Sequence, residues 1–306
     1  MTVLTLESAV ARGFARTPLV GAGEVHWCPE VMARLFSLIA SPVIQACTRT
    51  LVIEFGSQRH QAMLDDYIAG GELDATRLSL VSEDTLHGML WSPLVYQQFL
   101  AHVRDVNLTL SPGARWRVLA AEAPFDWSSA TEATWQSAMA RRDAHYADTV
   151  RRHVMAQGET ALLIFGAMHL QKGPPGIGDS ASLGHWLADE LTAIWPAMDS
   201  EAFSVDQWFT SDHDQVLDLA GNKEVGGLPW YRFSRRSEGE SMLSAHVDML
   251  WYPGPVSRRV AVPVERLSDA GWLARTRARL ARRSPARQAQ LNALLTREMH
   301  EQLRCE

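Results

Sequence analysis

Five ionisable side chains stand at the ends of apolar segments, where the buried strands of a sheet would stop. They are Glu24, His26, Glu54, Glu122 and His169. In open α/β sheets the active site lies beyond the carboxyl ends of the parallel strands, because loops and helix N-termini converge there. We therefore expect these side chains to face one crevice. Imidazole and carboxylate groups together could bind a divalent cation such as Zn, Mn or Co, or could move protons as a general base with its orienting partner.

Two of the segments end in the same local pattern, Gly-x-x-His. It runs from Gly23 to His26 and from Gly166 to His169. A glycine there permits a tight turn or the close approach of a ligand, and the histidine is carried at the rim. Glu54 lies inside the apolar run "LVIEFG", where an ionised carboxylate is costly to bury without a partner. A metal ion held by His26, His169 and Glu54 would lower the pKa of a water molecule bound to it to about 7. Without a metal, a histidine oriented by a carboxylate could activate water as a general base. Both routes lead to hydrolysis.

The elements that must position these groups alternate along the chain. Strands are predicted at 18–26, 50–56, 115–124, 160–170, 192–198 and 246–255, because short runs that are apolar almost throughout are typical of strands covered on both faces. Helices are predicted at 29–47, 58–71 and 129–158, and a shorter one at 183–191, from apolar spacing, Pro29 at a helix start and glycines at helix ends. This alternation predicts an α/β fold with a mostly parallel central sheet flanked by helices.

A single α/β domain is expected over residues 1–267, followed by a helical C-terminal extension over 268–306 that Pro285 divides in two. Within the domain, residues 173–245 are less regular, and 246–255 adds a core strand whose His246 and Asp248 alternate with apolar residues and are expected to be structural. The extension is rich in arginine. It is either a solvated face packed on the edge of the domain or an arm that binds a partner.

Composition excludes several classes of protein. Hydrophobic residues make up 46% of the chain and charged residues 21%, which is typical of globular proteins. The net charge of −6 argues against nucleic-acid binding. No apolar run reaches the roughly 20 residues of a membrane helix, and the N-terminal residues lack a signal-peptide pattern. Three widely spaced cysteines, Cys28, Cys47 and Cys305, fit reduced thiols, so a cytoplasmic location is expected.

Two other readings of the sequence fail. "GPPGIG" at 173–178 lacks the Lys-Ser/Thr of a phosphate loop. The serines Ser57, Ser92 and Ser128 lack a Gly-x-Ser-x-Gly elbow, which argues against a serine hydrolase.

Trp27 and Trp127 are candidates for aromatic walls near the crevice, which would suit a peptide or another apolar ligand.

Four motifs resemble known families, in the same order, across residues 18–172. "VGAGEVHWCPE" is similar to the Gly-Glu-x-x-His-x-x-x-Glu stretch of the erythromycin-esterase family. "LVIEFGSQRHQAMLDDYIAGG" resembles the second-strand glutamate and following helix of that family and of ChaN-like haem-binding proteins. "ARRDAHYADTV" resembles their "RDxxMA" helix, and "LLIFGAMHLQKG" the "GAxHLxG" stretch of the related metalloprotease-like Tiki and TraB proteins.

The resemblance implies roles for particular residues. His26 and His169 would be the paired histidines and Glu54 the glutamate of a metal site, with Glu24 and Glu30 as further carboxylates. Substrate would be bound by Glu30, Glu122, Arg142, Asp143, Trp27 and Trp127, and catalysis would rest on His26, Glu54, His169 and Glu24. Tyr146 stands where these relatives carry Met, and the chain beyond about residue 200 departs from the esterases.

A hydrolase is therefore expected, possibly metal-dependent, that cleaves an ester or amide bond in a peptide or macrolactone-like substrate. One alternative is a non-catalytic protein on the same scaffold that binds a precursor peptide and presents it to a partner enzyme in a natural-product pathway. A second alternative is a haem-binding protein with His or Tyr as axial ligands.

Overall fold

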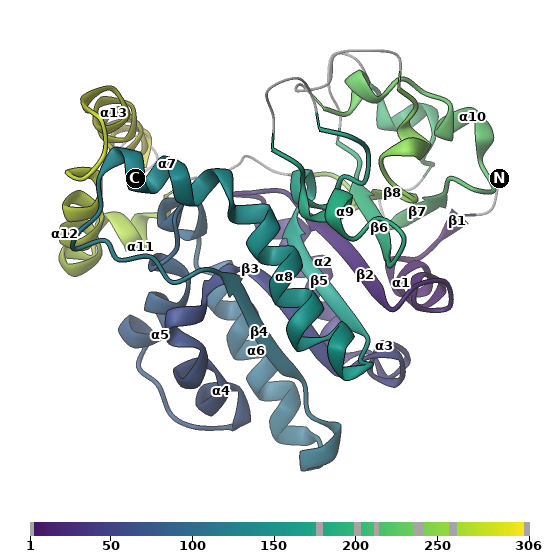
Figure 1. The fold of residues 1–306 in the computed structure, drawn as a ribbon, viewed down its shortest axis with the longest axis horizontal. Coiled ribbons are helices and arrows are strands. Elements are labelled where there is room, and N and C mark those ends of the chain that lie inside the picture. Colours follow the sequence, from purple (N-terminus) through teal and green to yellow (C-terminus); the bar gives the residue numbers. More distant parts are fainter. Residues whose placement is uncertain are drawn as a thin grey trace.

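The chain folds around one mixed sheet with helices on both faces (Figure 1). The computed structural model describes residues 3–175, 180–198, 203–210, 214–234, 241–256 and 262–302, with the side chains of the last helix described as far as Glu298. Parts of the less regular region 173–245, and the end of the C-terminal extension with Cys305, lie outside these ranges.

Eight strands make up the sheet within the described residues, in the order β1-β7-β8-β6-β2-β5-β3-β4. Their bounds are β1 (Val3–Leu4), β2 (Leu19–Glu24), β3 (Thr50–Ser57), β4 (Arg117–Glu122), β5 (Ala161–Gly166), β6 (Leu191–Pro196), β7 (Gln215–Asp218) and β8 (Met249–Tyr252). The six strands predicted from apolar runs are all present. The short strands β1 and β7 were not predicted, because two to four residues give too little pattern to identify.

Parallel pairing runs through the centre of the sheet. β2 lies between β5 and β6, β3 lies between β4 and β5, and β8 joins β6, all in parallel. Only β7 pairs antiparallel, with β1 and β8. The predicted mostly parallel α/β fold is confirmed. Four adjacent strands, β2, β5, β3 and β4, thus end at the same edge of the sheet.

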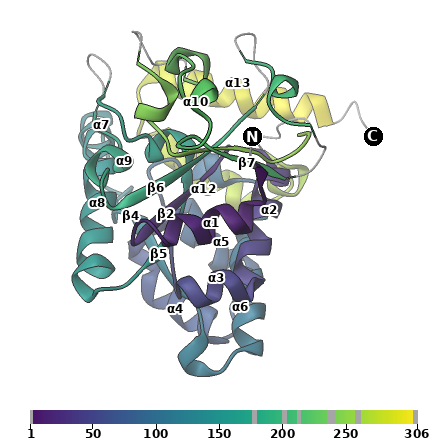
Figure 2. The same ribbon diagram turned by 90° about the vertical axis from the view of Figure 1, so that its right-hand side faces the viewer.

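Helices cover both faces, as Figure 2 shows with α8 on one side and α3 and α6 on the other. The helices are α1 (Leu6–Phe14), α2 (Pro29–Ala40), α3 (Pro42–Cys47), α4 (Gln61–Ala69), α5 (Ala75–Glu83), α6 (Val95–Thr109), α7 (Glu132–Ala140), α8 (Arg142–His153), α9 (Leu183–Trp186), α10 (Lys223–Gly226), α11 (Val264–Leu267), α12 (Ala270–Leu280) and α13 (Pro285–Gln302). Alternate residues of β3 point to opposite faces, so that Leu51 and Ile53 pack in one core cluster and Val52 in the other.

Three predicted helices differ from the structure. The helix expected over 29–47 breaks at Ser41, whose hydroxyl accepts the Ile44 N–H and caps a new helix that begins at Pro42. The helix expected over 129–158 begins after the Thr131 cap but is interrupted at Arg141, where φ is −104° and ψ is 2°. The helix expected over 183–191 stops after one turn, because Leu191 already begins β6.

The C-terminal residues form α11, α12 and α13, and α13 begins at Pro285, as predicted. These helices have an apolar cluster of their own, built on Val262, Trp272, Leu280 and Leu295. Within the described part of the chain, no helix is both long enough and apolar enough to cross a membrane.

Candidate functional site

Three glutamates are buried at the carboxyl edge of the sheet. Glu24 is the last residue of β2, Glu54 lies near the end of β3, and Glu122 is the last residue of β4. Each has a side chain no more than 1% exposed. β3 and β4 lose their regular register between Ile53 and Ser57, which sets Glu54 at an irregularity of the strand. Glu54 and Glu122 share Arg142 as a partner, and Glu24 offers a ligand atom within 4.8 Å of one on Glu54.

Arg142, at the start of α8, joins two of the carboxylates. Its Nη2 donates to Glu54 Oε1 at 2.9 Å and its Nε donates to Glu122 Oε2 at 2.7 Å, while its own side chain is only 4% exposed. Tyr146, one turn further along α8, donates its hydroxyl to the same Glu122 oxygen at 2.9 Å. Charge-assisted bonds of this kind are short and strong, so α8 is fixed against the ends of β3 and β4.

The two carboxylates that share Arg142 have pKa shifts of opposite sign. Burial would raise the pKa of Glu54, but His169 and Arg142 hold it well below its ordinary value. Burial also acts on Glu122, and there it prevails over Arg142 and raises the pKa. Glu54 therefore keeps its charge to a lower pH than Glu122 does.

His169 is held between two carboxylates. It lies in the 3₁₀ turn η5 (Ala167–Leu170), where its Nδ1 is 2.7 Å from Asp143 Oδ1 and its Nε2 is 3.2 Å from Glu54 Oε1. Asp143 is itself fixed by the Leu183 N–H, which donates to Oδ1 at 2.8 Å. Burial opposes the charged ring, but Glu54 and Asp143 together raise the pKa of His169 to about 10. His169 is a fixed cation at neutral pH.

His26 is held differently. Its Nδ1 contacts Glu24 Oε1, and the other Glu24 oxygen accepts the Tyr96 hydroxyl at 3.1 Å. The edge of the imidazole meets Trp91, with ring centroids 5.0 Å apart. Burial opposes protonation, but the Glu24 carboxylate prevails and raises the pKa of His26. With its side chain 30% exposed, His26 is more accessible than the carboxylates or His169.

Gly166 brings the two halves of the site together. It pairs with Glu24 in the register of β2 and β5, and its N–H donates to Glu54 Oε2 at 2.6 Å. A Cβ at this position would lie 2.8 Å from Cε1 of His26, 3.1 Å from its Nε2 and 3.1 Å from Glu54 Oε2. Only glycine lets the imidazole lie this close to the backbone, which explains the glycine of the second Gly-x-x-His pattern.

Glu24, His26 and Glu54 form a candidate metal site. Each offers a ligand atom, and these atoms lie within 4.8 Å of one another. Among the residues that the structure describes, His169 is not part of this group, because its two ring nitrogens face Asp143 and Glu54. One imidazole and two carboxylates fit Zn, Mn or Co. Glu54, however, already accepts from Arg142 and Gly166, so it would have to change partners to bind a metal.

The residues predicted to bind substrate are spread more widely. Trp27 has a left-handed backbone, with φ of 67°, and packs against the apolar cluster of the C-terminal helices. The guanidinium carbon of Arg279 lies over the Trp127 ring, 6.0 Å from the centre of that ring. Glu30 lies in the first turn of α2, outside the Glu24, His26 and Glu54 group. Arg142 is hydrogen-bonded to Glu54 and Glu122, and Asp143 contacts His169, so both residues are engaged with other side chains of the site.

Three further residues belong to the site but were not predicted: His87, Trp91 and Tyr96. Tyr96 and Trp91 stand in an apolar stretch without a local motif, and their approach to Glu24 and His26 depends on the packing of α6 on α2. Burial, together with the charge of Arg142, lowers the pKa of His87 to about 3. A neutral, half-buried histidine beside the site gives no signal in the sequence.

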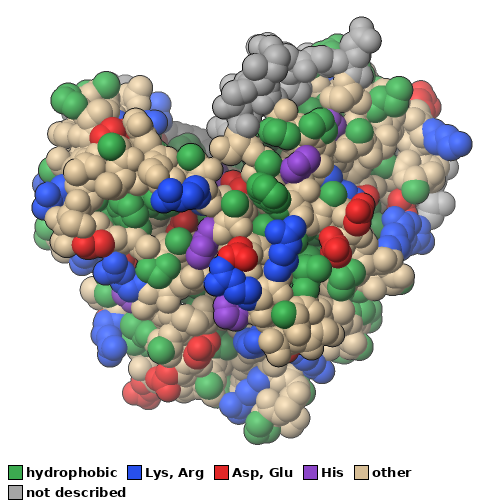
Figure 3. Space-filling view, viewed as in Figure 1, with side chains coloured by type: hydrophobic (Ala, Val, Ile, Leu, Met, Phe, Trp, Pro, Cys, Tyr) green, Lys and Arg blue, Asp and Glu red, His purple; other side chains and the backbone are tan. Residues whose placement is uncertain are grey.

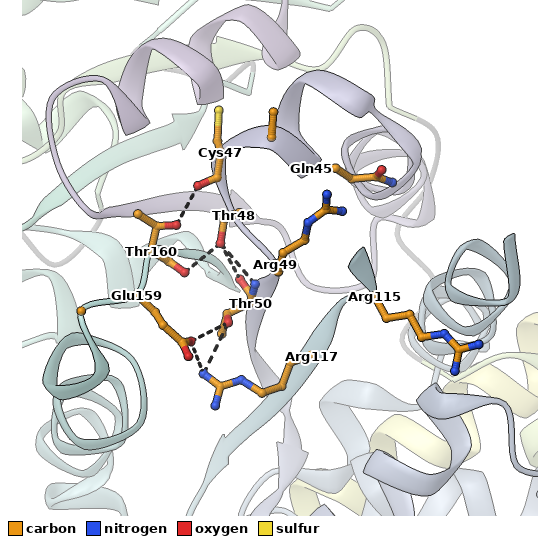
Figure 4. A pocket seen from close by; sticks show the side chains of 11 residues that line it. Gln45, Cys47, Thr48, Arg49, Thr50, Arg115, Arg117, Glu159 and Thr160 are labelled. Atoms are coloured by element: carbon orange, nitrogen blue, oxygen red, sulfur yellow. Dashed lines mark hydrogen bonds and ion pairs between the residues drawn. The ribbon is translucent and has the colours of Figure 1, made fainter. Parts of the chain in front are cut away.

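The molecule is hollowed on the side toward which these strands run. Figure 3 shows the hollow at the upper edge, between the part that carries α13 and the part that carries α10. A separate cavity of about 590 Å³ lies at the opposite, amino edge of the strands (Figure 4). There Glu159 accepts from Arg117 at 2.5 Å and from the Thr50 hydroxyl at 3.1 Å, and Thr48 donates to the Thr160 carbonyl. These bonds join the first residues of β3, β4 and β5.

Comparison with known proteins identifies the fold. No family model and no curated protein matches the sequence. A mutant erythromycin esterase in its open conformation is similar in structure, with a TM-score of 0.61 and 13% identity over 86% of this chain and 100% of that one. A succinoglycan biosynthesis protein has a TM-score of 0.58 and 10% identity, covering 81% and 90%. A protein from Bacillus cereus has a TM-score of 0.52 and 10% identity, covering 80% and 90%. The erythromycin-esterase-like fold that the motifs implied is confirmed.

Proposed function

We propose that the protein is a hydrolase of esters or amides in which His26 is the general base that activates water. The observation that carries this proposal is the setting of His26, an accessible imidazole fixed through Nδ1 by the buried carboxylate of Glu24. A carboxylate on one ring nitrogen selects the tautomer and leaves the other nitrogen to take a proton. The structural similarity to an erythromycin esterase supports an ester as the bond that is cleaved.

The fixed cations beside His26 support the same chemistry. When water attacks a carbonyl, negative charge develops on the carbonyl oxygen, and preorganised positive groups lower that barrier. His169 is protonated at neutral pH and its side chain is 18% exposed, so it is the cation nearest to solvent in the network. Because both of its ring nitrogens face carboxylates, we assign it a role through its charge and not through a hydrogen bond to the carbonyl oxygen, with Arg142 behind it as the counter-ion of Glu54.

A divalent cation bound by Glu24, His26 and Glu54 would supply Lewis-acid activation of water. The mechanism proposed here does not depend on it, since Glu54 is already paired with Arg142 and His169. The same contacts engage two of the side chains that could serve the haem alternative as axial ligands. Tyr146 donates to Glu122, and both nitrogens of His169 have carboxylate partners, so neither side chain is available as an axial ligand.

For the substrate, we propose a peptide or a macrolactone-like molecule. A hollow of the molecular surface lies on the side of the strand ends (Figure 3), and we propose that the substrate binds there. The aromatic side chain of Trp27, which follows His26 in the chain and is half-buried, is suited to the apolar parts of that substrate. If the protein instead binds a precursor peptide for a partner enzyme, the same hollow would hold it without turnover.

The test compares the wild type with His26→Ala on a panel of aryl esters, lactones and peptide amides. His153→Ala, which removes an exposed histidine at the end of α8, is the matched control. Loss of a general base is expected to lower kcat by about 10²–10⁴-fold, with an unchanged circular dichroism spectrum. Equal turnover in both variants would refute the role of His26. Turnover that disappears with EDTA and returns with Zn or Mn would show that the metal route is used instead.

A further inference from the structure

One segment of the chain has the proposed site on one side and the C-terminal helices on the other. This wall segment, residues 83–92, runs from the last residue of α5 to just before α6 and includes the 3₁₀ turn η2 (Gly88–Trp91). On its inner side, Trp91 meets His26 edge to face and lies 5.1 Å from Tyr96, ring centre to ring centre. Tyr96 in turn holds Glu24. The position of the wall segment therefore sets the surroundings of His26.

On its outer side, three arginines hold the wall segment. The carboxylate of Glu83 is buried and accepts from Arg275 in a fork, Nε to Oε2 at 2.9 Å and Nη2 to Oε1 at 3.3 Å. Arg279 donates to the Glu83 carbonyl at 2.5 Å and to Asp84 Oδ1 at 3.1 Å. We call Arg266, Arg275 and Arg279 the arginine latch.

Arg266 spans the segment from end to end. Its Nη1 is 3.4 Å from Glu83 Oε1, at the beginning of the segment, and its Nε donates to the Ser92 carbonyl at 3.2 Å, at the other end. The guanidinium is buried, with its side chain 7% exposed. The fork of Arg275 on the buried Glu83 carboxylate, and the two bonds of the buried Arg266, fix direction as well as distance, which loose surface pairs do not.

Apolar contacts join the same helices to both flanks of His26. Met89, within the wall segment, and Trp27, the residue after His26, both pack against the cluster of Val262, Trp272, Leu280 and Leu295. Trp27 has a φ of 67°, a conformation that is unfavourable for a non-glycine residue and persists only where the surroundings impose it. The C-terminal helices provide those surroundings.

We propose that the arginine latch positions His26 for catalysis, by holding the wall segment and Trp27 against its imidazole, and that Arg275 is a positioning residue of the hydrolase. This inference rests on the proposed function. It assigns the C-terminal helices the role of holding part of the site in place, because their arginines bind residues about 190 positions earlier in the same chain.

The test uses Arg275→Ala in the full-length protein, with Arg277→Ala as the matched control, because Arg277 lies on the same helix and is exposed. Hydrogen exchange is measured by mass spectrometry on peptides that cover residues 83–92, residues 24–28 and β5. In Arg275→Ala we expect exchange at 83–92 and 24–28 to rise about tenfold or more while β5 stays protected. We expect kcat to fall about tenfold or more with little change in KM, because the reacting groups are displaced and not removed.

Arg275→Lys keeps the charge but not the fork, and it is expected to fall between the wild type and Arg275→Ala in both measurements. It also serves if Arg275→Ala does not fold. Unchanged exchange at 24–28 in either folded variant would overturn the proposal. Faster exchange with an unchanged kcat would show that the latch is only structural, which also overturns it. The exchange measurement needs no turnover, so a failure of the latch is distinguishable from a failure of the proposed hydrolysis.

Discussion

Replacement of Arg142 by alanine tests whether the buried charges at the strand ends depend on one another. Arg142 makes two charge-assisted bonds, at 2.9 Å to Glu54 and 2.7 Å to Glu122. A hydrogen bond to a charged group contributes about 1.5–3 kcal/mol, so two contribute about 3–6 kcal/mol. Breaking a buried ion pair from one side costs about 3–5 kcal/mol, because the partner remains buried and uncompensated. We therefore expect Arg142→Ala to lower the free energy of unfolding by about 3–5 kcal/mol.

The assay is urea unfolding at pH 7, followed by tryptophan fluorescence. Arg152→Ala is the control, since Arg152 forms an exposed pair with Asp148 on the same helix, and such a pair contributes no more than about 1 kcal/mol. If Arg142→Ala costs no more than Arg152→Ala, the network is not a source of stability, and the reasoning from buried charge fails.

The pH dependence of the same variant gives an independent check. Without the guanidinium, the pKa values of Glu54 and Glu122 rise in the folded state, so that the native variant binds more protons than the native wild type. The difference in stability between the two proteins must then grow as the pH rises through the ordinary range of a carboxyl group and shrink as it falls. A difference that stays constant between about pH 3 and 6, a window that contains the ordinary titration range of a carboxyl group, would show that Arg142 acts through packing and not through charge.

Two further substitutions address the reacting groups themselves. Glu24→Gln removes the carboxylate that raises the pKa of His26 while burial of the ring persists, so the acidic limb of kcat/KM should move to lower pH; a limb that stays in place would mean that another group controls it. Gly166→Ala adds a Cβ 2.8 Å from the His26 ring. It should displace the ring and so lower kcat about tenfold or more, and it should lower the free energy of unfolding by about 1–3 kcal/mol. A kcat equal to that of the wild type would show that the close approach of Gly166 to His26 has no role in catalysis.

Local sequence patterns predicted the parts of the site that sit on strands. A glutamate inside an apolar run and two Gly-x-x-His patterns are local signals, and Glu24, Glu54 and His169 lie at the edge of the sheet that the strand order implies. Tyr96 and Trp91 gave no such signal, because their contacts with Glu24 and His26 arise when α6 packs against α2. The break at Ser41 did have a signal, since a serine before a proline is a typical helix cap and start.

Arginines in the C-terminal extension show the limit of charge patterns more clearly. An arginine-rich helix predicts a solvated face or a partner-binding arm. Which arginine is buried depends on an acidic residue that lies far away in the sequence. Glu83 lies 192 positions before Arg275 in the sequence. It is a single acidic residue at the end of an amphipathic helix, and this position alone does not predict a buried partner. Arg277, two residues from Arg275 on the same helix, is exposed, and nothing in the sequence near either residue distinguishes them.

The two histidines illustrate why a shared motif does not give a shared role. Both end a Gly-x-x-His pattern after a buried strand, and both contact a glutamate. His169 contacts two carboxylates, and a ring with a pKa of about 10 cannot serve as a base near neutral pH. His26 contacts one carboxylate, which is shared with Tyr96, and its ring is more exposed than that of His169. The number of carboxylates around each imidazole therefore separates the proposed proton acceptor, His26, from the cation, His169.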